Sequence, residues 1–302
     1  MDRFAPLFVI VAASLWGIDS IVLRPYLYTL PVPLVVLLES GIVVLLLSPF
    51  ALKHLKVVKT METKDLVSFL GVAIFGGAIG TMAITKALFY VNYINLSIVV
   101  LIQKLQPVFA LLLAAIFLRE RLSKPFFLWA LLAIVGAYFM TFGSEIPKFD
   151  TGNKTTIAAL YALLAAFSFG FSTVLSKRAL KNVTYATGTF IRFLTTTLIM
   201  LIVVGLFSDY SSVTEVTSTQ WLIFGIIAFT SGGMAIFLYY FGLKRISASV
   251  ATICELSFPL TAILLEYLIR DNILDWIQWA GAIVLIGSII KVSQTNIAKK
   301  KV

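Results

Sequence analysis

Two stretches half a chain apart decide the fold: residues 97–107 read SIVVLIQKLQP, and residues 249–259 read SVATICELSFP. They align without a gap at an offset of 152 residues, with serine first and proline last in both. Each lies inside a long apolar run and carries one charged residue, Lys104 in the first and Glu255 in the second. The sequence therefore predicts two related halves, each containing a polar membrane helix interrupted by proline.

Other residue pairs extend the repeat over most of the chain. We expect a first five-helix repeat over residues 1–145, a second over 154–295, and a basic cytoplasmic tail over 296–302. The further pairs, at offsets of 151 to 153 residues, are Trp16-Gly17 with Phe169-Gly170, Glu39 with Arg192, Gly80 with Gly232 and Gly136 with Gly287.

The composition indicates that most of the chain lies in lipid. Of the 302 residues, 60% are hydrophobic and 13% are charged, whereas soluble domains contain about 25% charged residues. A membrane helix takes about 20 apolar residues, and lipid offers no partner to an open sheet edge. We therefore predict an all-α integral membrane protein with ten transmembrane helices. Breaks in the apolar pattern place them at residues 5–28, 33–52, 67–90, 95–118, 124–142, 156–180, 186–207, 219–243, 247–269 and 274–294.

The lysine and arginine residues predict the orientation, because membrane proteins concentrate them on the cytoplasmic side. With the N-terminus inside, 17 of the 24 fall on the inner side, 3 within spans and 4 on the outer side, Arg24 among these. Both termini are thus predicted to be cytoplasmic, in the plasma membrane (the inner membrane of the cell). The net charge of +10 then does not indicate a nucleic-acid partner. Because five spans is an odd number, the second repeat is inverted, as in many secondary transporters.

With these features the chain resembles the drug/metabolite transporter (DMT) superfamily, and within it the EamA-type family. The resemblance covers essentially the whole chain. It implies an EamA-type fold and the export or exchange of small organic metabolites such as amino acids. The residues that carry it are Trp16-Gly17, Pro107, the hinge Arg119–Ser123 with Glu120, Gly136, Pro259, Trp279, Gly281 and Gly287.

Polar residues within the spans are candidates for substrate binding, because a charge in the bilayer interior should face a cavity or a partner. Pro107 and Pro259 each remove one helix hydrogen bond near mid-membrane and are predicted to free the carbonyls of Gln103 and Glu255. Interrupted helices at matching positions of two repeats indicate a transport site. The candidate substrate-binding residues are Trp16, Asp19, Ser20, Glu39, Lys86, Gln103, Lys104, Pro107, Arg192, Tyr239, Glu255 and Pro259.

Structural roles are the alternative for several of these residues. The intramembrane acids and bases are nearly balanced in number, so they permit ion pairs that only hold helices together. Lys86 could extend to the membrane surface, and Tyr239 and Tyr240 could belong to the aromatic belt. The small residues at 76–80 and 231–233 are more typical of close helix packing than of a ligand site.

We expect a secondary active or facilitative transporter, an exporter or exchanger, that works by alternating access. Lys104 and Glu255 near its centre would suit a zwitterion such as an amino acid, with Trp16 against the solute side chain. The alternative substrates are anionic metabolites, such as nucleotide sugars or phosphorylated compounds, held by Lys86, Lys104 and Arg192. A channel is the remaining alternative outside this class.

No enzymatic activity, cofactor or metal is expected. The chain has one cysteine, Cys254, and one histidine, His54, which lies in a lysine-rich loop. Neither an internal disulfide nor a His/Cys metal cluster can form from these. The expected partners are the lipid bilayer, a small-molecule substrate and, as one option, protons taken up by Asp19, Glu39 or Glu255. Ten spans can enclose a path within one chain, so we predict a monomer or a weak homodimer.

Overall fold

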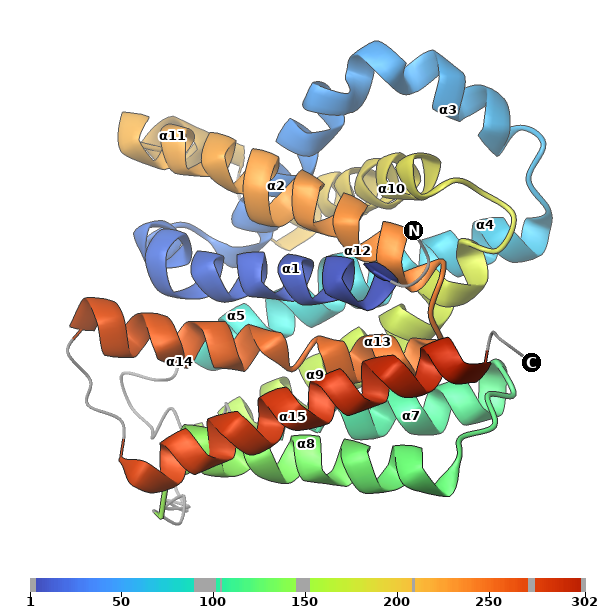
Figure 1. Ribbon diagram of the computed structural model, residues 1–302. Coiled ribbons are helices and arrows are strands. Elements are labelled where there is room, and N and C mark those ends of the chain that lie inside the picture. Colours follow the sequence, from blue (N-terminus) through green and yellow to red (C-terminus); the bar gives the residue numbers. More distant parts are fainter. Residues whose placement is uncertain are drawn as a thin grey trace.

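The computed structural model describes residues 4–89, 102–103, 105–144, 153–207, 210–270 and 275–299. These residues form a bundle of helices with no β-strand (Figure 1). Nine helical stretches in them are long and apolar enough to cross a membrane. They are Ala5–Leu27, Val32–Phe50, Thr63–Ala87, Lys124–Phe142, Thr156–Ala179, Tyr185–Phe207, Ser218–Leu243, Ala248–Ile269 and Trp276–Gln294.

These nine stretches coincide with nine of the ten predicted spans, which confirms the all-α membrane fold. The remaining span was predicted at residues 95–118, and its N-terminal part lies outside the described residues. Its C-terminal part is the apolar helix α7 (Gln106–Phe117). Pro107 stands in the first turn of α7, where its missing N–H costs no helix hydrogen bond.

Several spans contain changes of helix type. The elements of the first half are α1 (Ala5–Ile18), η2 (Asp19–Leu23), η3 (Arg24–Leu27), α2 (Val32–Leu47), η4 (Ser48–Phe50), α3 (Ala51–Val58), α4 (Thr63–Gly71), η5 (Val72–Ile79), α5 (Gly80–Phe89), α7 and α8 (Lys124–Phe142). Those of the second half are α9 (Asn153–Ala179), α10 (Tyr185–Phe207), η6 (Tyr210–Glu215), α11 (Ser218–Ile227), η7 (Ala228–Met234), α12 (Ala235–Leu243), α13 (Ala248–Cys254), α14 (Ser257–Arg270) and α15 (Trp276–Lys299). The segments η2, η5 and η7 are π-helical.

The packing of the helices repeats between the two halves. Helix α1 packs against α12 and α14, and its repeat mate α9 packs against α5 and α7, the mates of those helices. Helices α2 and α10 pack against each other, as do α8 and α15. The segments η5 and η7 fall in matching spans. Each helix contact in one half thus has an equivalent contact in the other, and one pseudo-symmetry axis relates them.

Small residues permit these contacts at equivalent places. A Cβ atom added at Gly17 would lie 2.8 Å from the carbonyl oxygen of Phe258 on α14. One added at Gly170 would lie 3.0 Å from the backbone nitrogen of Ala110 on α7. Real Cβ atoms are almost never closer than 3.0 Å, so position 17 needs glycine, and a side chain at position 170 would meet contacts tighter than nine in ten real ones. This explains why the Trp16-Gly17 motif recurs as Phe169-Gly170.

The tightest backbone contact joins α8 and α15. A Cβ atom added at Gly281 would lie 2.4 Å from the backbone nitrogen of Met140, and one added at Gly136 would lie 2.8 Å from the backbone nitrogen of Leu285. Gly287, which the sequence matched to Gly136, has nothing within 4 Å of such an atom. In the second repeat, the glycine that permits the close contact between α15 and α8 is therefore Gly281 and not Gly287.

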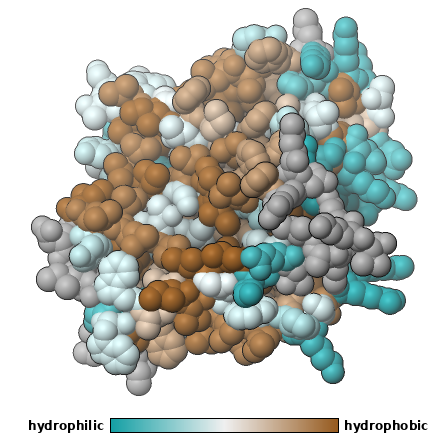
Figure 2. Space-filling view, viewed as in Figure 1, coloured by the Kyte–Doolittle hydropathy of each residue, from teal (hydrophilic) through white to brown (hydrophobic). Residues whose placement is uncertain are grey.

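Hydrophobic residues cover most of the face in Figure 2, and hydrophilic residues gather at one end of the bundle. The start of α1, the end of α15 and the loop between α3 and α4 lie at that end (Figure 1). Lys59 and Glu62 belong to that loop.

His54 does not lie in a loop, contrary to expectation. It belongs to α3 and is buried against α10, with its Nδ1 atom 3.1 Å from the Thr187 hydroxyl and its ring stacked on Phe190. Burial, and to a smaller degree the charge of Lys53, lowers the pKa of His54 below its ordinary value of 6.5. The folded protein therefore favours the neutral imidazole.

This burial predicts a pH-dependent stability. Because folding lowers the pKa, the stability contributed by His54 is present above a pH of about 6.5 and is lost as the pH falls through the folded-state value. We expect the denaturation temperature to fall between about pH 7.5 and pH 5.5, and to fall less in His54→Gln. Thermal denaturation of both proteins in detergent measures this. Equal falls in the two proteins would contradict the prediction.

The hinge residue Glu120 joins the two halves. Its carboxylate accepts hydrogen bonds from the backbone nitrogens of Ala248 and Ser249, at 2.8 and 3.1 Å, and from the Ser249 hydroxyl at 2.5 Å. The first N–H groups of a helix lack partners within it and favour an anion. Glu120, from the loop after α7, therefore caps the N-terminus of α13 in the second repeat.

Candidate functional site

Span 9 is interrupted where the sequence predicted, between α13 and α14. Glu255 and Leu256 form a turn, and Pro259 lies buried in the first turn of α14. The predicted free carbonyl of Glu255 is wrong, because that carbonyl accepts a 3.0 Å hydrogen bond from the backbone nitrogen of Phe258. The turn satisfies this backbone oxygen and leaves the Glu255 carboxylate as the polar group at the break.

Side chains from both repeats surround the Glu255 carboxylate. Gln106 donates to Oε2 from its Nε2 atom at 2.7 Å, and the Tyr239 hydroxyl donates to Oε1 at 2.7 Å. The Thr173 hydroxyl lies 3.4 Å from Oε1 and 3.0 Å from the Tyr239 oxygen. The Trp16 ring lies 5.5 Å from the Tyr239 ring. We call these five residues (Trp16, Gln106, Thr173, Tyr239 and Glu255) the central cluster.

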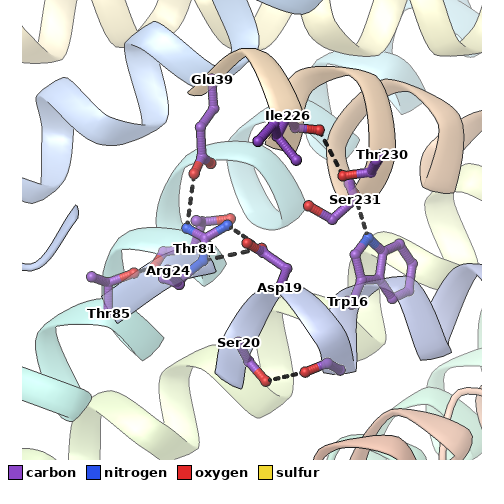
Figure 3. Close-up of polar contacts among 11 residues, drawn as sticks. Trp16, Asp19, Ser20, Arg24, Glu39, Thr81, Thr85, Ile226, Thr230 and Ser231 are labelled. Atoms are coloured by element: carbon purple, nitrogen blue, oxygen red, sulfur yellow. Dashed lines mark hydrogen bonds and ion pairs between the residues drawn. The ribbon is translucent and has the colours of Figure 1, made fainter. Parts of the chain in front are cut away.

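The central cluster combines a half-buried carboxylate with neutral hydrogen-bonding groups and two aromatic rings. Tyr239 and Thr173 are buried, whereas Trp16, Gln106 and Glu255 are half-buried. The indole nitrogen of Trp16 donates to the Ser231 carbonyl at 2.9 Å, which fixes the ring (Figure 3). Such a set can hold a planar polar molecule by aromatic contact and by hydrogen bonds at one edge.

The tyrosines do not belong to an aromatic belt at the membrane surface. Tyr239 and Tyr240 are 3% and 0% exposed, whereas belt residues face the lipid headgroups. The Tyr240 hydroxyl lies 3.2 Å from the Ser176 hydroxyl and 3.4 Å from Nη1 of Arg192, which donates to it. Arg192 therefore lies next to the central cluster and is bound to a tyrosine.

A second group of charges lies where α1 changes to π and 3-10 helix. Arg24 donates to Oδ2 of Asp19 from Nη2 at 2.7 Å and from Nε at 3.2 Å (Figure 3). Its Nη1 atom lies 3.1 Å from Oε1 of Glu39 on α2. We call Asp19, Arg24 and Glu39 the arginine triad. Asp19 and Glu39 thus pair with Arg24, which the sequence analysis counted among the basic residues of the outer side and did not name as a site residue.

The other predicted residues have different positions. Ser20 donates to the backbone carbonyl of Gly17 at 2.8 Å, so its hydroxyl serves the helix. Lys86 is exposed, and Gln103 is half-buried. Lys104 lies outside the described residues, so its predicted place beside Glu255 stays a prediction.

Sequence reasoning missed three residues of these two groups. Arg24 follows Asp19 by five residues, a spacing that an α-helix does not place on one face but that the π-turn η2 allows. Gln106 directly precedes Pro107, and Thr173 is the repeat mate of Ser20. A polar residue next to an intramembrane proline was therefore the available signal for Gln106.

Comparisons with known proteins agree with this architecture. The model of the EamA-like transporter family matches residues 3–142 and 156–294. The chain is 45% identical over 291 residues to "Riboflavin transporter ImpX" of Fusobacterium nucleatum subsp. nucleatum, covering 96% of this chain and 97% of that one. It is 28% identical over 273 residues to an uncharacterized transporter of Synechocystis sp., covering 86% of this chain and 75% of that one.

One solved crystal structure is similar along nearly the whole chain. It has a TM-score of 0.74 at 17% sequence identity and covers 97% of this chain and 96% of its own. At this identity the similarity shows the fold alone. The match to the family model over both halves and the identity to a named transporter show the family as well. The chain belongs to the EamA-like transporter family and is a membrane transporter of small metabolites, not an enzyme.

Proposed function

We propose that this protein carries riboflavin, or a closely related uncharged flavin, across the membrane. The observation that carries the proposal is the 45% identity to a protein named as a riboflavin transporter, which extends over 97% of that protein.

The chemistry of the central cluster supports this substrate. Riboflavin has a planar, uncharged ring system that can pack on the rings of Trp16 or Tyr239. One edge of that ring system carries an imide N–H between two carbonyl groups. The Glu255 carboxylate can accept from the N–H, and the Gln106 amide can donate to a carbonyl. The cluster thus offers both an acceptor and a donor to this edge.

An amino-acid substrate, expected from the sequence, has less support. That expectation rested on Lys104, which lies outside the described residues. Within the described residues, the groups that donate to the Glu255 carboxylate are the neutral side chains of Gln106, Tyr239 and Thr173, and the charge of Arg192 acts on it without a hydrogen bond. Amino acids, and anionic metabolites such as nucleotide sugars, therefore enter as competitors in the test below.

The proposed mechanism is alternating access between the two repeats. Equivalent contacts in the two halves (α1 with α12 and α14, α9 with α5 and α7) give inward-open and outward-open states of similar energy. The central cluster takes Trp16 and Gln106 from one repeat and the other three residues from its mate. Rocking of one repeat against the other would then expose the same residues to either side. We further propose a plasma-membrane location with both termini in the cytoplasm.

Transport into proteoliposomes tests this function. We expect saturable uptake of labelled riboflavin, with competition by excess unlabelled riboflavin and none by amino acids or a nucleotide sugar. The phosphate ester of riboflavin should compete poorly, because the central cluster presents a carboxylate. Empty liposomes and the exposed-residue variant Glu62→Gln are the controls. A monodisperse protein that takes up an amino acid or a nucleotide sugar, but not riboflavin, would show that the proposal is wrong.

A further inference from the structure

The arginine triad has more negative than positive charge in a buried place. Asp19 is 5% exposed, and the side chains of Arg24 and Glu39 are 19% and 14% exposed. Two carboxylates share one guanidinium, so the ionised triad carries one excess negative charge. An uncompensated charge in the membrane interior costs several kcal/mol. One bound proton would make the triad neutral.

The geometry distinguishes the two carboxylates. Arg24 makes two hydrogen bonds to Oδ2 of Asp19. Its contact with Oε1 of Glu39 is an ion pair at 3.1 Å in which that oxygen has no hydrogen bond. Oδ1 of Asp19 is also buried without a hydrogen-bond partner among the described residues. Glu39 is therefore the more weakly held of the two acids and the easier one to neutralise.

Other titratable groups near α2 do not balance this charge. Among the described elements that pack against α2, Arg192 on α10 donates to Tyr240, and Lys86 on α5 and Glu215 on η6 are exposed. Tyr210 on η6 donates to the Leu201 carbonyl. The electrostatic partners of the Glu39 carboxylate are Arg24 and Asp19, and Tyr28 in turn acts on Arg24.

The fold does not require these acids. At the repeat offset of 153 residues, the mates of Asp19, Arg24 and Glu39 are Ser172, Lys177 and Arg192. The second half thus builds the same helices with no acid at these places. Lys177 donates instead to the carbonyls at the end of α12. The two carboxylates are a property of the first repeat alone, which favours a function over a structural role.

We propose that the arginine triad is the proton-binding site of this transporter, with the proton taken by the Glu39 carboxylate. When Glu39 is ionised, Arg24 ties the end of span 1 to α2. When a proton binds, Glu39 loses its charge and its ion pair, and Arg24 stays with Asp19 alone. Proton uptake therefore releases η3 from α2, at the end of the span whose helix α1 carries Trp16 of the central cluster. The inference rests on transport as such and not on the identity of the solute.

A pH gradient across proteoliposomes tests the coupling, with the membrane potential held at zero. One proton moved with each uncharged solute gives about tenfold accumulation per pH unit. We expect accumulation of riboflavin to follow the gradient in the wild type. In Glu39→Gln we expect gradient-driven accumulation to be lost, while exchange of labelled for unlabelled riboflavin continues. Glu39→Asp, which can still bind a proton, should retain part of the accumulation, and Glu215→Gln should behave as the wild type.

A second measurement needs no solute. Infrared difference spectra of the purified protein between high and low pH should contain one protonated carboxyl component that is missing from the spectrum of Glu39→Gln, while the components of the other acids remain. If riboflavin is not transported but this component appears, the solute assignment fails and the proton site stands. Accumulation that ignores the gradient in the wild type would overturn the proposal. So would a gradient response that persists in a folded Glu39→Gln protein, or a carboxyl difference spectrum that this substitution leaves unchanged.

Discussion

Alanine in place of Gly281 is expected to lower the stability of the folded protein by about 1–3 kcal/mol or more, the range seen for overpacked interiors. The added Cβ atom would lie 2.4 Å from the backbone nitrogen of Met140 and 2.9 Å from the backbone carbon of Phe139. Backbone atoms cannot move aside as a flexible side chain can, so α15 must shift away from α8. Thermal denaturation in detergent, followed by size-exclusion chromatography, measures the loss.

Gly287→Ala provides the matched control, because it makes the same chemical change on the same helix. A Cβ atom at Gly287 meets nothing within 4 Å, and alanine favours a helix over glycine by about 1 kcal/mol. We expect Gly287→Ala to be as stable as the wild type or slightly more stable. Equal stabilities of the two variants would show that the contact between α8 and α15 is not the constraint described here.

Loss of the Glu255 carboxylate is expected to have the largest effect on transport. In Glu255→Ala, Gln106 and Tyr239 lose the acceptor they share, and a substrate loses its acceptor at the helix break. Hydrogen bonds to a charged group contribute about 1.5–3 kcal/mol, which corresponds to a decrease of about 10- to 100-fold in kcat/KM. Initial rates of riboflavin uptake measure this. A variant within about twofold of the wild type would exclude Glu255 from the site.

Tyr239→Phe is the control for this effect. It removes one hydrogen bond to Glu255 and keeps the ring that lies 5.5 Å from Trp16. A single hydrogen bond contributes about 1 kcal/mol, so the variant should lose about fivefold. Both variants must keep the elution profile of the wild-type protein, since loss of fold would lower uptake for another reason.

The fold was predictable because its signals are long-range and redundant. The apolar runs determine the spans, and the offset of about 152 residues relates Pro107 to Pro259. The break in span 9 followed from Pro259 through its effect on helix hydrogen bonding. The role of Gly281 was not predictable from the offset, which pointed to Gly287 instead. Such a role depends on where two helices cross, and one sequence does not contain that information.

The site was predictable only in part. Trp16, Tyr239 and Glu255 were named from the sequence, and they meet in the central cluster. Arg24 was counted among the outer-side basic residues and was not named as a partner of Asp19, because residues five apart do not lie on one face of an α-helix. The π-turn changes which residues share a face, and no composition rule predicts it. Thr173 is an ordinary small residue of a membrane helix, and only the tertiary contacts bring it to Glu255.

The cap that Glu120 places on α13 links the position of the hinge loop to the position of the Glu255 carboxylate. Helix α13 has 7 residues, so at about 1.5 Å per residue it is a rod of about 10 Å. Glu120 binds the N-terminus of this helix, and Glu255 follows directly at its C-terminus. A shift of the hinge loop along the axis of α13 therefore displaces the Glu255 carboxylate by a similar distance, because a short straight helix moves as a rigid body. Helix α13 thus connects the hinge loop of the first repeat directly to the Glu255 carboxylate of the second.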